Sequence, residues 1–233
     1  MTSSIELIEF TTGGDPAAQP VASIVVLHGL GADGRDFVPV AQAMDLSTIG
    51  PVRFVFPSAP ARPVTINGGY EMRAWYDIFS LSTDPAAPRK EDEAGLRESQ
   101  AIVLQLVERE VQRGVPAHRV VLMGFSQGCA MTLLAGLRAQ QRLAGLVALS
   151  GYLPLAATTA AQASEANRGV PVFMAHGDAD DIVVLARGEA ARDALAALGY
   201  PVHWHSYPMG HEVCMDEIAD LNAWLEGRLS NPA

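Results

Sequence analysis

A serine flanked by glycines is the residue whose surroundings best fit covalent chemistry. Ser126 lies in Gly124-Phe125-Ser126-Gln127-Gly128, after an apolar run at residues 120–123 and before a segment with apolar residues at helical density. This order predicts a strand, a sharp turn and a helix, with the serine held out alone on the turn. Glycine is needed on both sides because a Cβ at Gly124 or Gly128 would collide with the neighbouring strand or helix. We therefore expect Ser126 to be a nucleophile at a helix N-terminus, where free N–H groups favour negative charge.

A serine hydroxyl is a poor nucleophile at neutral pH, so a base and an orienting acid should lie near it. In open parallel sheets such side chains gather in the loops beyond the carboxyl ends of the strands. His211 follows the last expected strand, comes after the serine in chain order and stands beside a glycine, and we expect it to be the base. The other histidines flank strands or alternate along one. Of these, His203 and His205 could hold a metal, but no further ligand has the spacing to complete a site.

Two further loops carry candidate residues. Asp178, Asp180 and Asp181 share one turn after the strand expected at residues 170–175, and the sequence alone does not decide which carboxylate reaches the imidazole. The glycine-rich residues 28–34 follow another expected strand and let the backbone come close to a ligand. A phosphate-binding loop is the rival interpretation, but its lysine and its Gly-x-Gly-x-x-Gly spacing are missing. A loop that binds an acyl oxygen fits better.

Composition limits the possible partners and the compartment. The chain has 233 residues, 49% of them hydrophobic, and a formal net charge of -10. It can bury one sizeable core without disulfides or metals, so we expect a single domain over residues 1–233. The acidic balance argues against nucleic acid or an anionic membrane as a partner. Two cysteines form no disulfide framework, which favours a reducing, cytoplasmic compartment. Neither a targeting segment nor a membrane span is expected.

The elements that must position these residues alternate along the chain. We expect an edge strand and buried strands, amphipathic helices over them, a turn at residues 13–16, an aromatic insertion at residues 65–81 outside the main sheet, and a loop at residues 80–88. Residues 156–168 fit either a helix or a loop. This alternation predicts an α/β fold with a mostly parallel sheet covered on both faces. The expected strands are residues 5–10, 22–27, 52–56, 119–123, 143–149, 170–175 and 202–207, and the expected helices are residues 91–113, 127–137, 185–198 and 212–229.

Taken together, these motifs resemble the bacterial carboxylesterase and acyl-protein thioesterase family of α/β-hydrolases. The resemblance implies an α/β-hydrolase fold. It also implies that Asp180 is the catalytic acid, with Asp178 a turn residue, and that the backbone N–H groups of Leu30 and Gln127 form an oxyanion hole. The segments that carry the resemblance are residues 27–34, 73–78, 124–128, 149–153, 176–180 and 210–212.

The activity implied is two-step acyl transfer by Ser126, His211 and Asp180, without a metal or an organic cofactor. The resemblance implies a serine carboxylesterase that hydrolyses esters with short to medium acyl chains. The alternative that it leaves open is acyl-protein thioesterase or lysophospholipase activity, and it also implies a possible homodimer. Trp75, Phe79 and Ile182 are expected to wall the acyl site, although the aromatic residues could equally be ordinary packing.

Two alternatives remain. One is a dienelactone- or peptide-type hydrolase, although the former usually has cysteine at the position of Ser126. The other, from a different class, is a non-catalytic binding protein on a hydrolase fold. Such proteins typically lack a member of the triad, whereas none is missing here.

Overall fold

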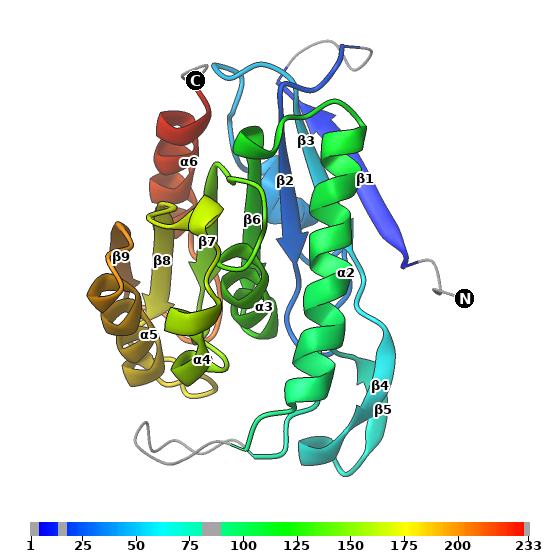
Figure 1. The fold of residues 1–233 in the computed structure, drawn as a ribbon, viewed down its shortest axis with the longest axis vertical. Helices are drawn as coiled ribbons and strands as arrows, with labels where there is room; N and C mark the ends of the chain where they lie inside the picture. Colours follow the sequence, from blue (N-terminus) through cyan, green and yellow to red (C-terminus); the bar gives the residue numbers. More distant parts are fainter. Residues whose placement is uncertain (1–4, 14–17, 81–89, 231–233) are drawn as a thin grey trace.

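The computed structural model describes residues 5–13, 18–80 and 90–230. At its centre is a seven-stranded sheet with the order β1-β3-β2-β6-β7-β8-β9, seen in Figure 1. β1 runs antiparallel to β3 at one edge, and the other neighbouring pairs are parallel. The mostly parallel sheet and the edge position of the first strand are as predicted. The strands are β1 (Leu7–Thr12), β2 (Ala22–Leu27), β3 (Val52–Pro57), β6 (Val120–Phe125), β7 (Gly145–Leu149), β8 (Val172–Gly177) and β9 (Val202–Tyr207).

Helices cover both faces of this sheet, because successive residues of each buried strand point to opposite sides. On one side Val25 and Leu27 of β2 pack in a cluster with α2, α3 and α5, and on the other Ile24 and Val26 pack in a cluster with α1 and α6. Burial on both faces is why the central strands read as unbroken apolar runs. The helices are α1 (Val38–Gln42), α2 (Glu93–Gln112), α3 (Gln127–Gly136), α4 (Ala156–Gln162), α5 (Leu185–Ala197) and α6 (Met215–Leu229).

The helix α2 shows why the periodic segments were the most predictable. Its N-cap is Asp92, whose side chain accepts a hydrogen bond from the N–H of Gly95 at 3.0 Å. The helix gives way to Gly114, which has a φ of 93°, a conformation that glycine adopts without strain. Between these ends an apolar stripe that includes Leu96 and Val103 is buried against the sheet.

The insertion forms its own small sheet. β4 (Ala61–Val64) and β5 (Tyr70–Arg73) pair antiparallel in a two-stranded hairpin, as expected for a segment outside the core. In Figure 1 this hairpin lies at the end of the molecule toward which the arrowheads of β2 and β8 point. The carboxyl ends of the parallel strands and the insertion therefore share one end of the fold. The predicted turn and loop at residues 14–16 and 81–88 lie outside the described residues.

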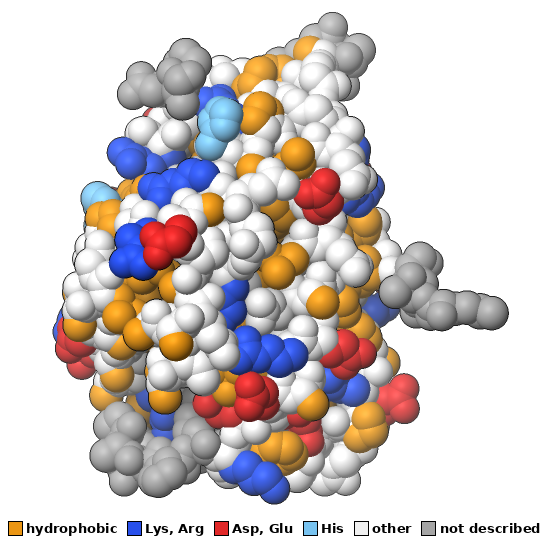
Figure 2. Space-filling view, in the orientation of Figure 1, with side chains coloured by type: hydrophobic (Ala, Val, Ile, Leu, Met, Phe, Trp, Pro, Cys, Tyr) orange, Lys and Arg blue, Asp and Glu red, His pale blue; other side chains and the backbone are white. Residues whose placement is uncertain are grey.

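The surface agrees with an acidic but mixed composition. On the face shown in Figure 2, acidic and basic side chains lie side by side and no large basic patch is visible. Over the described ranges, no helix is both long enough and apolar enough to cross a bilayer.

Candidate active site

The turn that carries Ser126 is a strained junction between β6 and α3. Ser126 has φ 55° and ψ -115°, a conformation in which non-glycine residues are uncommon. Its N–H donates to the carbonyl of Leu149 on β7 at 2.9 Å, which holds the turn against the neighbouring strand. A Cβ at Gly124 would lie 2.2 Å from the carbonyl oxygen of Gly128, and one at Gly128 would lie 2.0 Å from that of Leu27. Both glycines are thus required by close packing, as the sequence predicted.

Three distant side chains meet at the serine. The Ser126 hydroxyl donates to Nε2 of His211 at 2.9 Å, and Nδ1–H of His211 donates to Oδ2 of Asp180 at 2.7 Å. A carboxylate only accepts hydrogen bonds, so this pairing places the imidazole proton on Nδ1 and leaves Nε2 free to take the serine proton. The ring of Phe125 packs against the imidazole with centroids 4.7 Å apart. The arrangement has the geometry of a nucleophile, a base and an orienting acid.

The structure distinguishes among the three candidate aspartates. Asp178 and Asp181 are exposed, whereas Asp180 is buried. Its Oδ1 accepts the backbone N–H groups of Ile182 at 3.0 Å and Val183 at 2.8 Å, and its Oδ2 faces His211. Burial alone would raise the pKa of Asp180, but the hydrogen bonds that the carboxylate accepts outweigh it and hold that pKa well below its usual range. Asp180 is therefore ionised wherever the protein is folded near neutral pH.

Backbone hydrogen bonds join the loop of Asp180 to the loop of His211. Asp178 N–H donates to the carbonyl of Tyr207 at 2.8 Å, and Ala179 N–H donates to that of Met209 at 3.1 Å. Gly177 allows this approach, because a Cβ there would lie 2.2 Å from the carbonyl oxygen of Gly210. The loops of Asp180 and His211 are consequently fixed to one another through the main chain.

Two backbone donors are left free beside the serine. Among the described residues, no acceptor bonds to the N–H of Leu30 or of Gln127. Gln127 is the first residue of α3, where N–H groups have no partner within the helix. Leu30 follows Gly29, at which a Cβ would lie 3.4 Å from the Cβ of Ser126. Gln127 is thus bonded directly to Ser126, and Leu30 follows a residue that packs against it, so these two N–H groups are the candidates for binding an acyl oxygen that becomes negatively charged.

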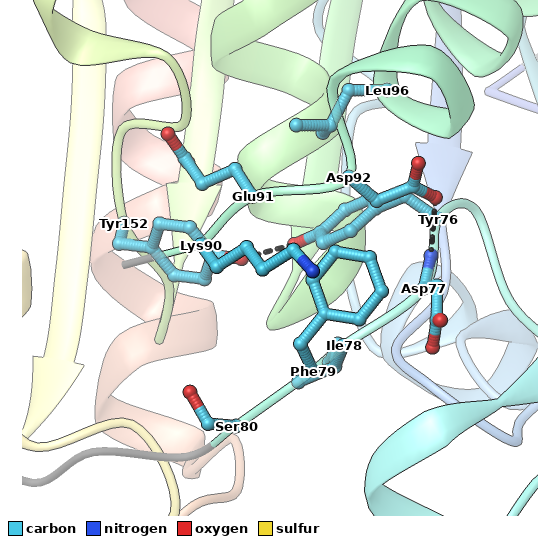
Figure 3. Close-up of a pocket in the computed structure, with 10 residues that line it drawn as sticks. All are labelled: Tyr76, Asp77, Ile78, Phe79, Ser80, Lys90, Glu91, Asp92, Leu96 and Tyr152. Atoms are coloured by element: carbon cyan, nitrogen blue, oxygen red, sulfur yellow. Dashed lines mark hydrogen bonds between the residues drawn. The ribbon is translucent and has the colours of Figure 1, made fainter. Parts of the chain in front are cut away.

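A small pocket lies between the insertion and the start of α2, and Ser126, His211 and Asp180 are not among the residues that line it. In Figure 3 the ammonium group of Lys90 lies over the ring of Phe79, 4.8 Å from the ring centroid, and both residues line the pocket. The hydroxyls of Tyr76 and Tyr152 form a hydrogen bond of 2.6 Å at its wall. Tyr152 follows Gly151, at which a Cβ would lie 2.9 Å from the carbonyl oxygen of Ser126. One wall residue of the pocket is thus the chain neighbour of a glycine that packs against the Ser126 turn.

The three residues expected to wall the acyl site differ in their surroundings. Phe79 lines the pocket of Figure 3, and Ile182 is 51% exposed two residues beyond Asp180. The expectation that Trp75 walls the acyl site is wrong, because Trp75 has no exposed surface and a substrate cannot contact it. Its backbone N–H donates to Oε1 of Gln127 at 2.7 Å, and its indole N–H donates to the carbonyl of His28 at 3.0 Å. These bonds hold the ring beneath the site, in the core.

Two histidines that flank strands, His176 and His28, lie at the site or beside it, and sequence reasoning gave neither of them a role. Nε2–H of His176 donates to the carbonyl of Val183 at 2.6 Å and lies 3.3 Å from Oδ2 of Asp180. His28 lies directly before the loop that carries Leu30 and is 1% exposed. The sequence signal that could have identified both histidines is a polar residue at the end of an otherwise apolar, buried strand. By contrast, His203 and His205 make no such contact, and no metal-binding group of three acidic, cysteine or histidine residues occurs in the described parts of the chain.

Comparisons with known proteins agree with this architecture. The family model described as Phospholipase/Carboxylesterase matches residues 13–228. Acyl-protein thioesterase 1 of Neurospora crassa is 42% identical over 221 residues, which cover 93% of this chain and 90% of that protein. The crystal structure of Zea mays acyl-protein thioesterase 2 superposes with a TM-score of 0.80 at 30% identity, covering 95% of this chain and 99% of the other. That of Arabidopsis thaliana SOBER1 gives a TM-score of 0.83 at 31% identity, covering 89% and 99%.

The match begins directly after β1 and extends into the last helix, and the fold is the α/β-hydrolase fold. The resemblance recognised in the motifs is therefore confirmed over nearly the whole length. The chain belongs to the phospholipase/carboxylesterase family of α/β-hydrolases and is a serine hydrolase.

Proposed function

We propose that this enzyme is an acyl-protein thioesterase, which hydrolyses the thioester between a fatty acyl group and a protein cysteine. The observation that carries the chemistry is the hydrogen-bonded chain from Ser126 through His211 to Asp180, beside two free N–H donors. The choice of thioester rests on relatives such as the Neurospora crassa protein, which is named acyl-protein thioesterase 1.

In the proposed reaction His211 Nε2 takes the Ser126 proton as the serine oxygen bonds to the acyl carbon. The carbonyl oxygen becomes an oxyanion that the N–H groups of Leu30 and Gln127 bind, each contributing about 3 kcal/mol to the barrier reduction. The carbon–sulfur bond then breaks, and the thiolate leaves with the proton from His211. Water attacks the acyl-enzyme with His211 as base, and the carboxylic acid departs as Ser126 regains its proton.

Asp180 has a supporting role in this scheme. It keeps the imidazole in the tautomer with the proton on Nδ1 and stabilises the cation formed when Nε2 is protonated. Ile182 and Phe79 are the residues that we propose to contact the acyl chain, because both are apolar and at least partly exposed, Ile182 two residues beyond Asp180 and Phe79 at the pocket of Figure 3.

A second candidate is hydrolysis of oxygen esters with short to medium acyl chains, which the description of the matching family model favours. The same residues would act in the same order, and only the leaving group would differ. Because an alkoxide leaves less readily than a thiolate, oxygen esters demand more of His211 as a general acid.

The experiment compares matched thioesters and oxygen esters with acyl chains of increasing length. We expect kcat/KM for an S-acylated peptide to exceed that for its O-acyl counterpart and to rise with chain length. A preference for oxygen esters at every chain length would contradict the thioesterase assignment and favour the esterase. Ser126→Ala is the matched control and should lower turnover by about 10⁴-fold or more. Intact mass after reaction with a fluorophosphonate should show one adduct that maps to Ser126, and an unlabelled protein would rule out both candidates.

A further inference from the structure

We propose that His28 and Trp75 are positioning residues that aim the Leu30 N–H at the oxyanion, and that the side chain of Gln127 joins this donor to the second one. The inference deepens the proposed function, because it rests on the Leu30 and Gln127 N–H groups being the oxyanion hole. None of the three side chains needs to touch the substrate. Their effect passes through the backbone that they hold.

The two ring nitrogens of His28 have opposite hydrogen-bonding roles. Nε2 receives the backbone N–H of Ala59 at 2.9 Å, so it carries no proton. Nδ1 is 2.6 Å from the carbonyl oxygen of Gly29, which can only accept, so Nδ1 carries the proton. The two contacts therefore fix one neutral tautomer. Burial also lowers the pKa of His28 below its usual range, which agrees with a neutral ring.

The acceptor of His28 belongs to the same peptide unit as the proposed donor. The carbonyl of Gly29 and the N–H of Leu30 share one planar peptide bond and point in opposite directions from it. A hydrogen bond that fixes the Gly29 oxygen therefore fixes the direction of the Leu30 N–H. The next N–H, of Gly31, donates to the carbonyl of Arg73 at 2.9 Å, so the loop is held on both sides of the free donor.

Trp75 extends this restraint to the preceding peptide unit and to the nucleophile turn. Its indole N–H donates to the carbonyl of His28 at 3.0 Å, and its own backbone N–H is received by Oε1 of Gln127 at 2.7 Å. Nε2 of Gln127 in turn donates to the carbonyl of Tyr76 at 2.7 Å. Gln127 is 2% exposed and Trp75 has no exposed surface, so water does not compete for these bonds. The residue that supplies one donor through its backbone thus anchors the other donor through its side chain.

The test uses two replacements of His28 that preserve different halves of its bonding. In His28→Asn the amide nitrogen is as many bonds from the backbone as Nδ1, so it can still donate to Gly29. In His28→Gln the amide oxygen is as many bonds from the backbone as Nε2, so it can still receive the N–H of Ala59. A purely structural role predicts that the two variants differ only in thermal stability. Orientation of the oxyanion donor predicts that they differ in kcat.

Removing one oxyanion donor lowers kcat by about 10²–10³, so a donor that is present but misdirected should cost about tenfold to a hundredfold. We expect His28→Gln to lose this much in kcat with KM nearly unchanged. The kcat of His28→Asn should be at least tenfold higher than that of His28→Gln. Affinity for a trifluoromethyl ketone, which forms an oxyanion on Ser126, should weaken in parallel with kcat/KM. Equal kcat in the two variants, or a higher value in His28→Gln, would overturn the proposal.

Trp75→Phe provides a second measurement if the His28 variants do not fold. It removes the indole N–H and keeps an aromatic ring in the core. Trp224→Phe is its matched control, because the indole N–H of Trp224 is buried with no partner among the described residues. We expect Trp75→Phe to lower kcat and the ketone affinity together, and Trp224→Phe to change neither; a loss of thermal stability alone in Trp75→Phe would refute the link. Failure of the wild-type protein to react with a fluorophosphonate at Ser126 would instead overturn the proposed function.

Discussion

Replacing Asp180 by asparagine should reverse the tautomer of the catalytic imidazole without changing the shape of the site. In the structure Oδ1 receives two backbone N–H groups and Oδ2 receives Nδ1–H of His211. The two backbone N–H groups need an acceptor at the Oδ1 position, so in Asp180→Asn the amide oxygen occupies that position and the amide NH₂ must face His211. Two donors cannot bond to each other, so the ring proton moves from Nδ1 to Nε2. Nε2–H then points at Ser126 and cannot accept its proton.

The expected loss in kcat is about 10⁴-fold, which corresponds to about 5 kcal/mol at 1.36 kcal/mol for each factor of ten. The loss should appear in kcat more than in KM, because the tautomer matters for proton transfer and not for binding. Thermal stability should change much less than activity, since the variant keeps the bonds to the backbone. Steady-state hydrolysis of a chromogenic ester and a thermal melt on the same samples measure both quantities.

The neighbouring aspartates provide matched controls on the same turn. Asp178→Asn and Asp181→Asn alter exposed carboxylates and should change kcat by less than about threefold, as surface substitutions usually do. An Asp180→Asn variant that retains more than a tenth of the wild-type kcat would refute the tautomer argument. A large loss in either control would move the orienting role to that residue.

Three further predictions concern stability. Gly128→Ala should prevent folding or lower the melting temperature severely, because its Cβ would lie 2.0 Å from a carbonyl oxygen of β2. Its control is Gly227→Ala, which should be neutral or stabilising by up to about 1 kcal/mol, because a Cβ at Gly227 meets nothing within 4 Å. Burial raises the pKa of Glu217 from 4.5 to about 8, against a smaller lowering by a backbone N–H, so the folded state holds this proton and stability should fall as pH rises between those values. Glu217→Gln should therefore melt above the wild type near pH 8 and match it near pH 4, while the exposed Asp216→Asn should show no such trend. Glu110→Ala should cost about 3–5 kcal/mol in denaturant unfolding, because it strands a buried arginine; a cost below about 1 kcal/mol would contradict this.

The fold was predictable where burial imposes a simple period. β2 and β9 have the predicted bounds, and α2 lies within its predicted range, because unbroken apolar runs and a 3.6-residue stripe are local signals. The helix α1 was missed, since it has only five residues with a proline near its start. β8 continues through His176 and Gly177, beyond the predicted end, because the packing of its last glycine against another loop is not encoded locally.

The meeting of Ser126 and His211 in the candidate site was predictable from the sequence, and the residues that support them were less so. Ser126 and His211 lie in motifs whose glycines indicate a sharp turn, and in the structure the two side chains form a hydrogen bond. The choice of Asp180 came only from the family resemblance, because which of three aspartates faces inward depends on hydrogen bonds to the following backbone. The hydrogen bonds that His28 makes with Ala59 and Trp75, and the one that joins Trp75 to Gln127, link residues 31 to 52 positions apart in the chain, so no local sequence pattern predicts them.

The distribution of the site over the sheet leaves the end of β7 without a reacting group. β2, β6, β8 and β9 each lead into a loop that carries part of the proposed machinery, whereas β7 leads into residues 150–155, among them Tyr152 at the pocket wall. A library of variants confined to Tyr152 and its successors would reshape what fits beside the serine and leave every proton-transfer group in place. Substrate selectivity can therefore change at this position through variants that all retain the groups needed for hydrolysis.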